Sequence, residues 1–335
     1  MSDGETIELP ETTVPAGLTM SIQGFTSEDA AKELGYAVLD CIKTLGRVID
    51  LSTLDGVTIA IDYDAALANL DRGLDGLKPL TRSDSAEMQG VAMSTCVMRG
   101  NQVKTHLIFK ANVVEALTVE GASAEDIQQS IGIIAHECAH VQINALKELS
   151  IPDARLGAQC ETYERGVLFQ IAEICWDEYA VCRFSAPFAK SQNEQHAEVL
   201  IAVVSVARDR SNEAFRSYRL HADDNRLVGE AGRALCEPLK AVSYLLGGLD
   251  GADESWADWN DARLAVEAAG YEDLVDELHQ SLRELWETQQ NWDPTRDTFS
   301  PLLQIVRRVF ESEGIYFRTE SDGLTYIDLA FRNTI

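Results

Sequence analysis

Residues 131–141 read Ile-Gly-Ile-Ile-Ala-His-Glu-Cys-Ala-His-Val and place His136 and His140 four positions apart. Side chains at this spacing project from one face of an α-helix, so both imidazoles can reach a single metal ion. Glu137 directly follows the first histidine, where a carboxylate can accept a proton from a metal-bound water. The spacing therefore predicts a metal site, provided that the segment is helical.

Helical phase supports that condition. With about 100° per residue and His136 taken as zero, one apolar stripe lies between about 140° and 220°, whereas His140 lies at about 40° and Glu137 at about 100°. Ser123, with Asp126 three residues later, suits a helix N-cap. The segment from Ser123 to about residue 188 is thus predicted as two long helices joined near residues 150–153. The stripe consists of Ile127, Ile131, Ile134, Cys138, Val141 and Ala145.

A catalytic zinc site needs a third protein ligand, and no histidine follows in residues 141–150. Among the acids of the next predicted helix, Glu178 stands in the middle of an apolar stripe, while Asp177 and Glu173 point about 100° and 140° away from it, toward water. A buried carboxylate needs a cation, which a metal ion held by the two histidines supplies. We therefore predict Zn²⁺ bound by His136, His140 and Glu178. Asp177 is the alternative ligand, and an ion pair between Glu178 and an arginine such as Arg183 is the alternative without metal.

A hydrolytic site also needs a second donor for the developing oxyanion. The sequence favours none of five candidates, which are His106, Tyr179, His196, Tyr218 and His221. Cys138 lies inside the first apolar stripe, and Cys175 and Cys182 share the stripe of Glu178. We interpret all three as core residues rather than as a nucleophile or thiolate ligands.

The amino-acid composition argues against some classes of binding partner. The chain has 335 residues with 28 Lys and Arg against 55 Asp and Glu, a formal charge of −27. Such an excess of acid argues against binding to nucleic acid or to anionic lipid. The seven cysteines are an odd number, widely spaced, and the first twenty residues resemble no signal peptide. We expect a cytoplasmic protein with reduced thiols and with no membrane partner.

The remaining pattern predicts an α+β protein that is predominantly helical. We expect the second strand of the predicted hairpin to be half-exposed, with His106 on its polar face. We also expect the C-terminal helical region to break near residues 223–225, at Gly247-Gly248 and at Gly270. The predicted helices are 27–46, 65–74, 191–290 with these breaks, and 302–313. The predicted strands are 57–61, 91–98 with 102–111 as a hairpin, and 315–317 with 324–329 as a second hairpin.

The motif resembles that of the gluzincin-type zinc metallopeptidases, in which a glutamate on the helix after the motif, here Glu178, is the third ligand. Residues 178–186 read EYAVCRFSA and are similar to the third-ligand helix of the ImmA/IrrE-like peptidases. The likeness covers about residues 55–190. It departs from the family pattern one turn after Glu178, where Cys182 replaces an aspartate.

The resemblance implies a zincin-like catalytic domain over residues 27–190. The sequence pattern itself predicts an extended arm (1–26) before this domain and a helical region with a small hairpin (191–335) after it. The resemblance also implies Glu137 as general base, a sheet edge strand beside the cleft, and a protein or peptide substrate. We expect zinc-dependent hydrolysis of peptide bonds in a narrow set of intracellular targets. The alternatives are a catalytically idle zincin scaffold that acts as a metal-dependent sensor or interaction module, and a helical structural protein without metal.

Overall fold

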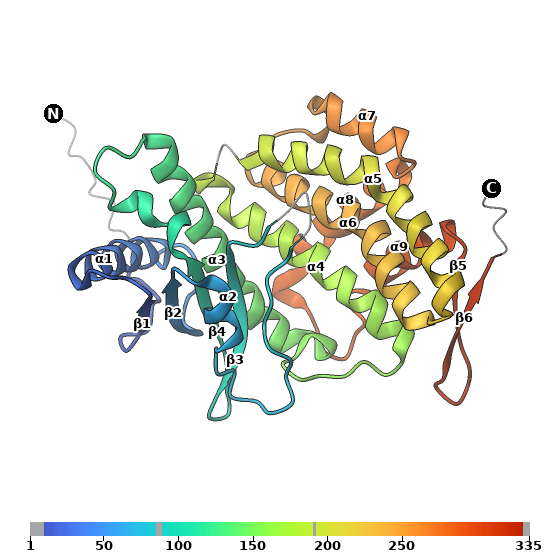
Figure 1. Cartoon of the computed structure of the whole chain (residues 1–335), viewed down its shortest axis with the longest axis horizontal. Helices are drawn as coiled ribbons and strands as arrows, with labels where there is room; N and C mark the ends of the chain where they lie inside the picture. Colours follow the sequence, from blue (N-terminus) through green and yellow to red (C-terminus); the bar gives the residue numbers. More distant parts are fainter. Residues whose placement is uncertain (1–9, 85–88, 190–191, 331–335) are drawn as a thin grey trace. The chain divides into compact units, whose positions relative to one another are not determined.

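The computed structural model describes residues 10–84, 89–189 and 192–330. Helices account for most of these residues and strands form two small sheets, which confirms the prediction of a predominantly helical α+β protein (Figure 1). The chain divides into two compact units, residues 1–146 and 147–335. The predicted catalytic domain of residues 27–190 is defined by family likeness rather than by compactness, and it stays a prediction.

The first unit is built on a four-stranded sheet with the strand order β1-β2-β4-β3. Strands β1, β2 and β4 are mutually parallel, and β3 runs antiparallel to β4 at one edge. The hairpin turns at Gly100, whose φ of 61° suits glycine. The predicted arm contributes the edge strand β1, while its residues 1–9 lie outside the described residues. The strands are β1 (Thr19–Gln23), β2 (Leu54–Ala60), β3 (Ala92–Arg99) and β4 (Gln102–Lys110).

The expectation of a half-exposed second hairpin strand is wrong. Strand β4 lies between β2 and β3, and Leu107 and Phe109 are fully buried, as is Ile108 on the opposite face. His106 is only 8% exposed, since Asp55 and Thr58 hydrogen-bond its two ring nitrogens at 3.0 and 2.9 Å. Burial lowers the pKa of His106, which keeps the imidazole neutral. Its polar groups are thus satisfied inside the sheet rather than by solvent.

The helices of the first unit follow the sequence signals closely. Ser27 caps α1 by accepting a hydrogen bond from the Ala30 amide, and Gly46 ends the helix, as predicted. Helix α2 is shorter than the predicted 65–74, since it ends before Asn69. Ser123 accepts a hydrogen bond from the Asp126 amide at the start of α3, which confirms the predicted N-cap. The elements are α1 (Glu28–Leu45), α2 (Tyr63–Ala68), the 3₁₀ turns η1 (Ala111–Val113) and η2 (Glu115–Leu117), and α3 (Ala124–Ser150), whose last four residues belong to the second unit.

The second unit is a helical assembly in which α6 packs against both α4 and α5 (Figure 1). The C-terminal hairpin is present as predicted, with β5 antiparallel to β6. The helices are α4 (Tyr163–Ser185), α5 (Gln192–His221), α6 (Asp224–Gly251), α7 (Asn260–Ala268), α8 (Glu272–Thr288) and α9 (Ser300–Ser312). The strands are β5 (Ile315–Thr319) and β6 (Thr325–Leu329), and the 3₁₀ turns are η3 (Pro152–Ala154), η4 (Ala186–Phe188), η5 (Trp256–Asp258) and η6 (Gln289–Asn291).

Two of the three predicted breaks in the C-terminal helical region are confirmed. Asp223 caps α6, and Gly270, with φ of 77°, separates α7 from α8. The predicted break at Gly247-Gly248 is wrong, because α6 continues through both residues. A Cβ atom on Gly247 would lie 2.2 Å from the carbonyl oxygen of Tyr179 in α4. The glycine therefore serves the close approach of two helices, which a single sequence does not reveal.

The close approach leads to a prediction. We expect Gly247→Ala to lower the free energy of unfolding by about 1–3 kcal/mol, because α4 backbone must move to admit the methyl group. Gly229→Ala on the same helix is the matched control, since its Cβ would meet nothing within 4 Å. Gly229→Ala should instead raise the free energy of unfolding by up to about 1 kcal/mol, because alanine has a higher helix propensity than glycine. Urea titrations followed by circular dichroism measure both, and equal effects would contradict the packing explanation.

No helix within the described ranges combines the length and the apolar character that spanning a bilayer requires.

Candidate metal centre

Helix α3 presents the two histidines as the sequence predicts. Ile134, Cys138 and Val141 of the apolar stripe are fully buried, whereas His136 and His140 are half-buried. The two imidazole rings lie with centroids 5.0 Å apart and with their planes at 79°. The packed side of the helix thus fixes its rotation and places the two imidazoles where one nitrogen of each can reach the same metal ion.

Glu137 is buried, at 6% exposure, and it is held by the neighbouring edge strand. The hydroxyl of Ser94 in β3 lies 2.7 Å from Oε2 of Glu137 and 2.9 Å from the backbone carbonyl oxygen of the same residue. A hydroxyl donor favours the ionised carboxylate, which is the form that can accept a proton. Ser94 could not be predicted from the sequence, since one serine in a strand carries no pattern.

Glu178 meets both histidines at the level of ligand atoms. One nitrogen of His136, one nitrogen of His140 and one carboxylate oxygen of Glu178 all lie within 4.8 Å of one another. Among the described residues this is the set of histidine, cysteine and acidic side chains whose spacing could hold a metal ion. The Glu178 side chain is 12% exposed. The structure therefore brings together the three predicted ligands.

The donor set fits a catalytic zinc ion in its chemistry. Two imidazoles and one glutamate are a recurrent ligand set of zinc hydrolases, which leave the fourth position to water. Donor atoms around a tetrahedral zinc ion are about 3.4 Å apart, given bond lengths of about 2.1 Å. The three candidate donor atoms lie within 4.8 Å of one another, a limit that includes this spacing.

Comparisons of the chain with protein-family models, with curated proteins and with solved structures found no match. What supports a metal centre is therefore the geometry and the donor chemistry of these three side chains.

Asp177, the alternative third ligand, has a different partner. The ammonium group of Lys147 lies 2.5 Å from Asp177 and 2.8 Å from Glu173, and only 6% of the Lys147 side chain is exposed. Burial raises the pKa of Asp177 to about 7, although the charge of Lys147 opposes this shift. Asp177 and Glu173 are both partly exposed, as expected for residues outside the apolar stripe, and both carboxylates bind a buried lysine, which the sequence did not predict.

Arg183, the predicted alternative partner of Glu178, is engaged elsewhere. Its guanidinium group donates to the Tyr179 hydroxyl at 2.5 Å and lies 4.7 Å from the centre of the Trp286 ring. The cation beside Glu178 is Lys240 of α6, with Nζ 3.9 Å from Oε1. Lys240 is a second residue that the sequence analysis missed, because it is far from the motif in the chain.

The five candidate oxyanion donors are dispersed. Tyr179 donates to Asp250 at 2.6 Å, and His106 is bound within the sheet as described above. Tyr218 donates to Asp224 near the end of α5, where His221 accepts from the Asp223 amide. The ring of His196 lies 5.2 Å from that of Tyr244, the residue one turn after Lys240. Of these five candidates, His196 is thus the one whose ring contacts Tyr244, which also lies beside Lys240.

The cysteines near the motif behave as core residues. Cys138 is fully buried, and Cys175 and Cys182 are 1% and 2% exposed. Burial raises the pKa of Cys175 to about 12 and that of Cys138 well above its usual value. Both thiols stay protonated at neutral pH, which disfavours a nucleophile or a thiolate ligand.

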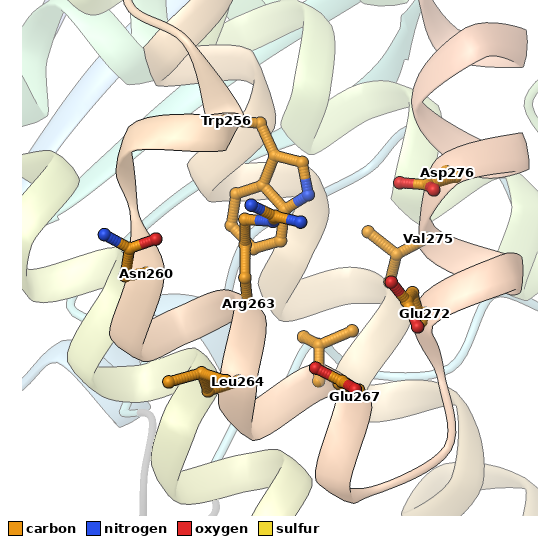
Figure 2. Close-up of a pocket in the computed structure, with 9 residues that line it drawn as sticks. Trp256, Asn260, Arg263, Leu264, Glu267, Glu272, Val275 and Asp276 are labelled. Atoms are coloured by element: carbon orange, nitrogen blue, oxygen red, sulfur yellow. The ribbon is translucent and has the colours of Figure 1, made fainter.

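A separate small pocket lies between η5, α7 and α8 (Figure 2). Its volume is about 100 Å³, below the roughly 300 Å³ at which sites for small molecules begin. None of its lining residues belongs to the candidate metal centre, so we assign it no part in the chemistry. The side chains include Trp256, Asn260, Arg263, Leu264, Glu267, Glu272, Val275 and Asp276.

Proposed function

We propose that this chain is a zinc-dependent peptidase of the gluzincin type, which hydrolyses peptide bonds in protein or peptide targets. The observation that supports it most is the convergence of His136, His140 and Glu178 within 4.8 Å, with the Glu137 carboxylate next in sequence to the first ligand. A site that only binds a metal has no need of a buried carboxylate at that position.

Glu137 acts as the proton carrier in this proposal. A zinc ion held by the three ligands would supply Lewis acidity toward the scissile carbonyl group and would acidify water. Glu137 takes a proton from the attacking water and later delivers it to the leaving amine. Ser94, by donating to Oε2, keeps this carboxylate oriented throughout.

The position of β3 supports an extended substrate. This strand is at the edge of the sheet, and its Ser94 contacts Glu137. An edge strand can bind an extended peptide by main-chain hydrogen bonds. A peptide added to β3 would run close to the Glu137 carboxylate, where its scissile bond is needed.

Metal binding is the direct test. We expect isothermal titration of the full chain to give one tightly bound Zn²⁺, and His140→Ala or Glu178→Gln to weaken it by about 100-fold or more. His221→Ala, at the end of α5, is the matched control and should bind zinc like the wild type. A wild-type chain that binds no zinc, or ligand variants that bind it equally well, would contradict the proposal.

A further inference from the structure

We propose that Lys240 is the second donor of this site and that its ammonium group binds the oxyanion that develops on the scissile carbonyl oxygen. The inference rests on the proposed function and adds a residue to it. Lys240 lies on α6, the helix that packs against α4, and its Nζ is 3.9 Å from Oε1 of Glu178. An ammonium group carries three N–H donors, which can be shared among several acceptors.

The distance indicates proximity without a direct hydrogen bond. Contact ion pairs between ammonium and carboxylate groups measure about 2.7–2.9 Å, whereas Lys240 and Glu178 are 3.9 Å apart. Lys147 illustrates the tight case in the same unit, with 2.5 and 2.8 Å to its two carboxylates. Lys240 is thus close to the carboxylate without spending its donors on it.

The charge balance of the centre calls for an anion. Two neutral imidazoles, one carboxylate and a divalent ion would sum to one positive charge. Lys240 adds a second and the ionised Glu137 offsets one of the two, which leaves one positive charge. A lysine beside a metal ion opposes metal binding by like-charge repulsion, so its placement is unfavourable unless an anion also binds. The oxyanion formed during peptide hydrolysis is such an anion, and catalysis gains most from donors placed where charge develops.

Two aromatic side chains, Tyr244 and His196, lie beside Lys240 and help to position it. Nζ of Lys240 lies 5.7 Å from the centre of the Tyr244 ring, which is one turn later on α6. The centre of the His196 ring, on α5, lies 5.2 Å from the centre of the Tyr244 ring. The Lys240 side chain is 22% exposed, so part of it reaches solvent.

Lys240 transfers no proton in this proposal. Water adds to the carbonyl carbon, the C–N bond breaks, and the proton taken by Glu137 leaves with the amine. Lys240 contributes only hydrogen bonds and charge, which makes it the electrostatic partner of the base.

Anion binding to the metal-loaded chain tests the assignment without a known substrate. The probe is inorganic phosphate, a tetrahedral anion, added to full-length chain loaded with one equivalent of Co²⁺, whose visible absorption reports on the bound anion. We expect Lys240→Met to weaken phosphate binding by about 10- to 100-fold, the effect of losing a charge-assisted hydrogen bond. Co²⁺ itself should bind as tightly as before or more tightly.

Two matched variants distinguish a local contact between Lys240 and phosphate from a general effect of positive charge on phosphate binding. Arg233→Met removes an exposed positive charge two turns earlier on α6 and should leave phosphate binding unchanged. Lys240→Arg should retain most of the affinity, which also controls for folding.

Two outcomes would overturn the inference while the proposed function stands. One is phosphate binding within twofold of wild type in Lys240→Met with Co²⁺ bound. The other is weakened binding of acetate alone, since that would assign Lys240 to a substrate carboxylate. A wild-type chain that binds no Co²⁺ refutes the proposed function instead, and this inference with it.

Discussion

Replacing Glu137 by glutamine should abolish peptide hydrolysis while the metal stays bound. Loss of a general base costs about 10²- to 10⁴-fold in rate. The amide keeps the size of the carboxylate and an oxygen that can accept from the Ser94 hydroxyl, now 2.7 Å from Oε2, so the local structure should persist. The measurement is the release of new termini from a complex peptide library by mass spectrometry, with bound zinc determined on the same sample.

Glu125→Gln is the matched control, because this glutamate is exposed in the first turn of the same helix. It should cleave the library like the wild type. If Glu137→Gln retains both zinc and wild-type cleavage, Glu137 is not the base. If the wild type binds zinc but cleaves nothing, the idle scaffold that acts as a sensor becomes the better explanation.

The three candidate ligands could be predicted from sequence because they follow helical periodicity. The motif and its apolar stripe fix the rotation of α3, and Glu178 stands out as a carboxylate inside a second stripe. Ser94 and Lys240 could not be found this way. Each comes from another element, and neither residue type departs from what a strand or an amphipathic helix ordinarily contains.

The wrong predictions about the fold also arose from contacts with other elements. His106 appeared exposed because it alternates with apolar residues, yet Asp55 and Thr58 satisfy its ring nitrogens inside the sheet. Gly247 suggested a helix break, yet it permits contact with the backbone of α4. Both outcomes depend on tertiary neighbours, which local patterns do not encode.

The position of Lys147 could have been predicted from the helical phase of α3. It lies about 20° from His136 on the face of α3 that carries both histidines, by the same periodicity. Its ammonium group joins Glu173 and Asp177 of α4, the latter next to Glu178. Burial by itself lowers the pKa of Lys147, but attraction by the two carboxylates outweighs it and raises the pKa. Deprotonation of Lys147 therefore removes this stabilisation only above its usual pKa of 10.5, whereas protonation of Asp177 weakens the ion pair as the pH falls through about 7.

We expect Lys147→Met to lower the free energy of unfolding by about 3–5 kcal/mol at pH 8, since it leaves two carboxylates near one another without their cation. The loss should shrink by about 1 kcal/mol or more at pH 5. Asp177 already has a pKa raised to about 7, and without Lys147 the pKa rises further. A carboxyl group with a raised pKa stabilises the fold when protonated, and that contribution disappears as pH rises through the pKa.

Urea titrations at pH 5 and pH 8, followed by circular dichroism, measure both effects. Adding Asp177→Asn to the Lys147→Met variant should restore much of the stability and remove most of the pH dependence, because Glu173 is then the one carboxylate of this cluster that stays charged. Lys43→Met, an exposed lysine of α1, should change stability by less than about 0.5 kcal/mol. A Lys147→Met variant that loses less than about 1 kcal/mol at pH 8 would mean that water already screens these carboxylates, and the buried cluster would then not be what holds this end of α3 to α4.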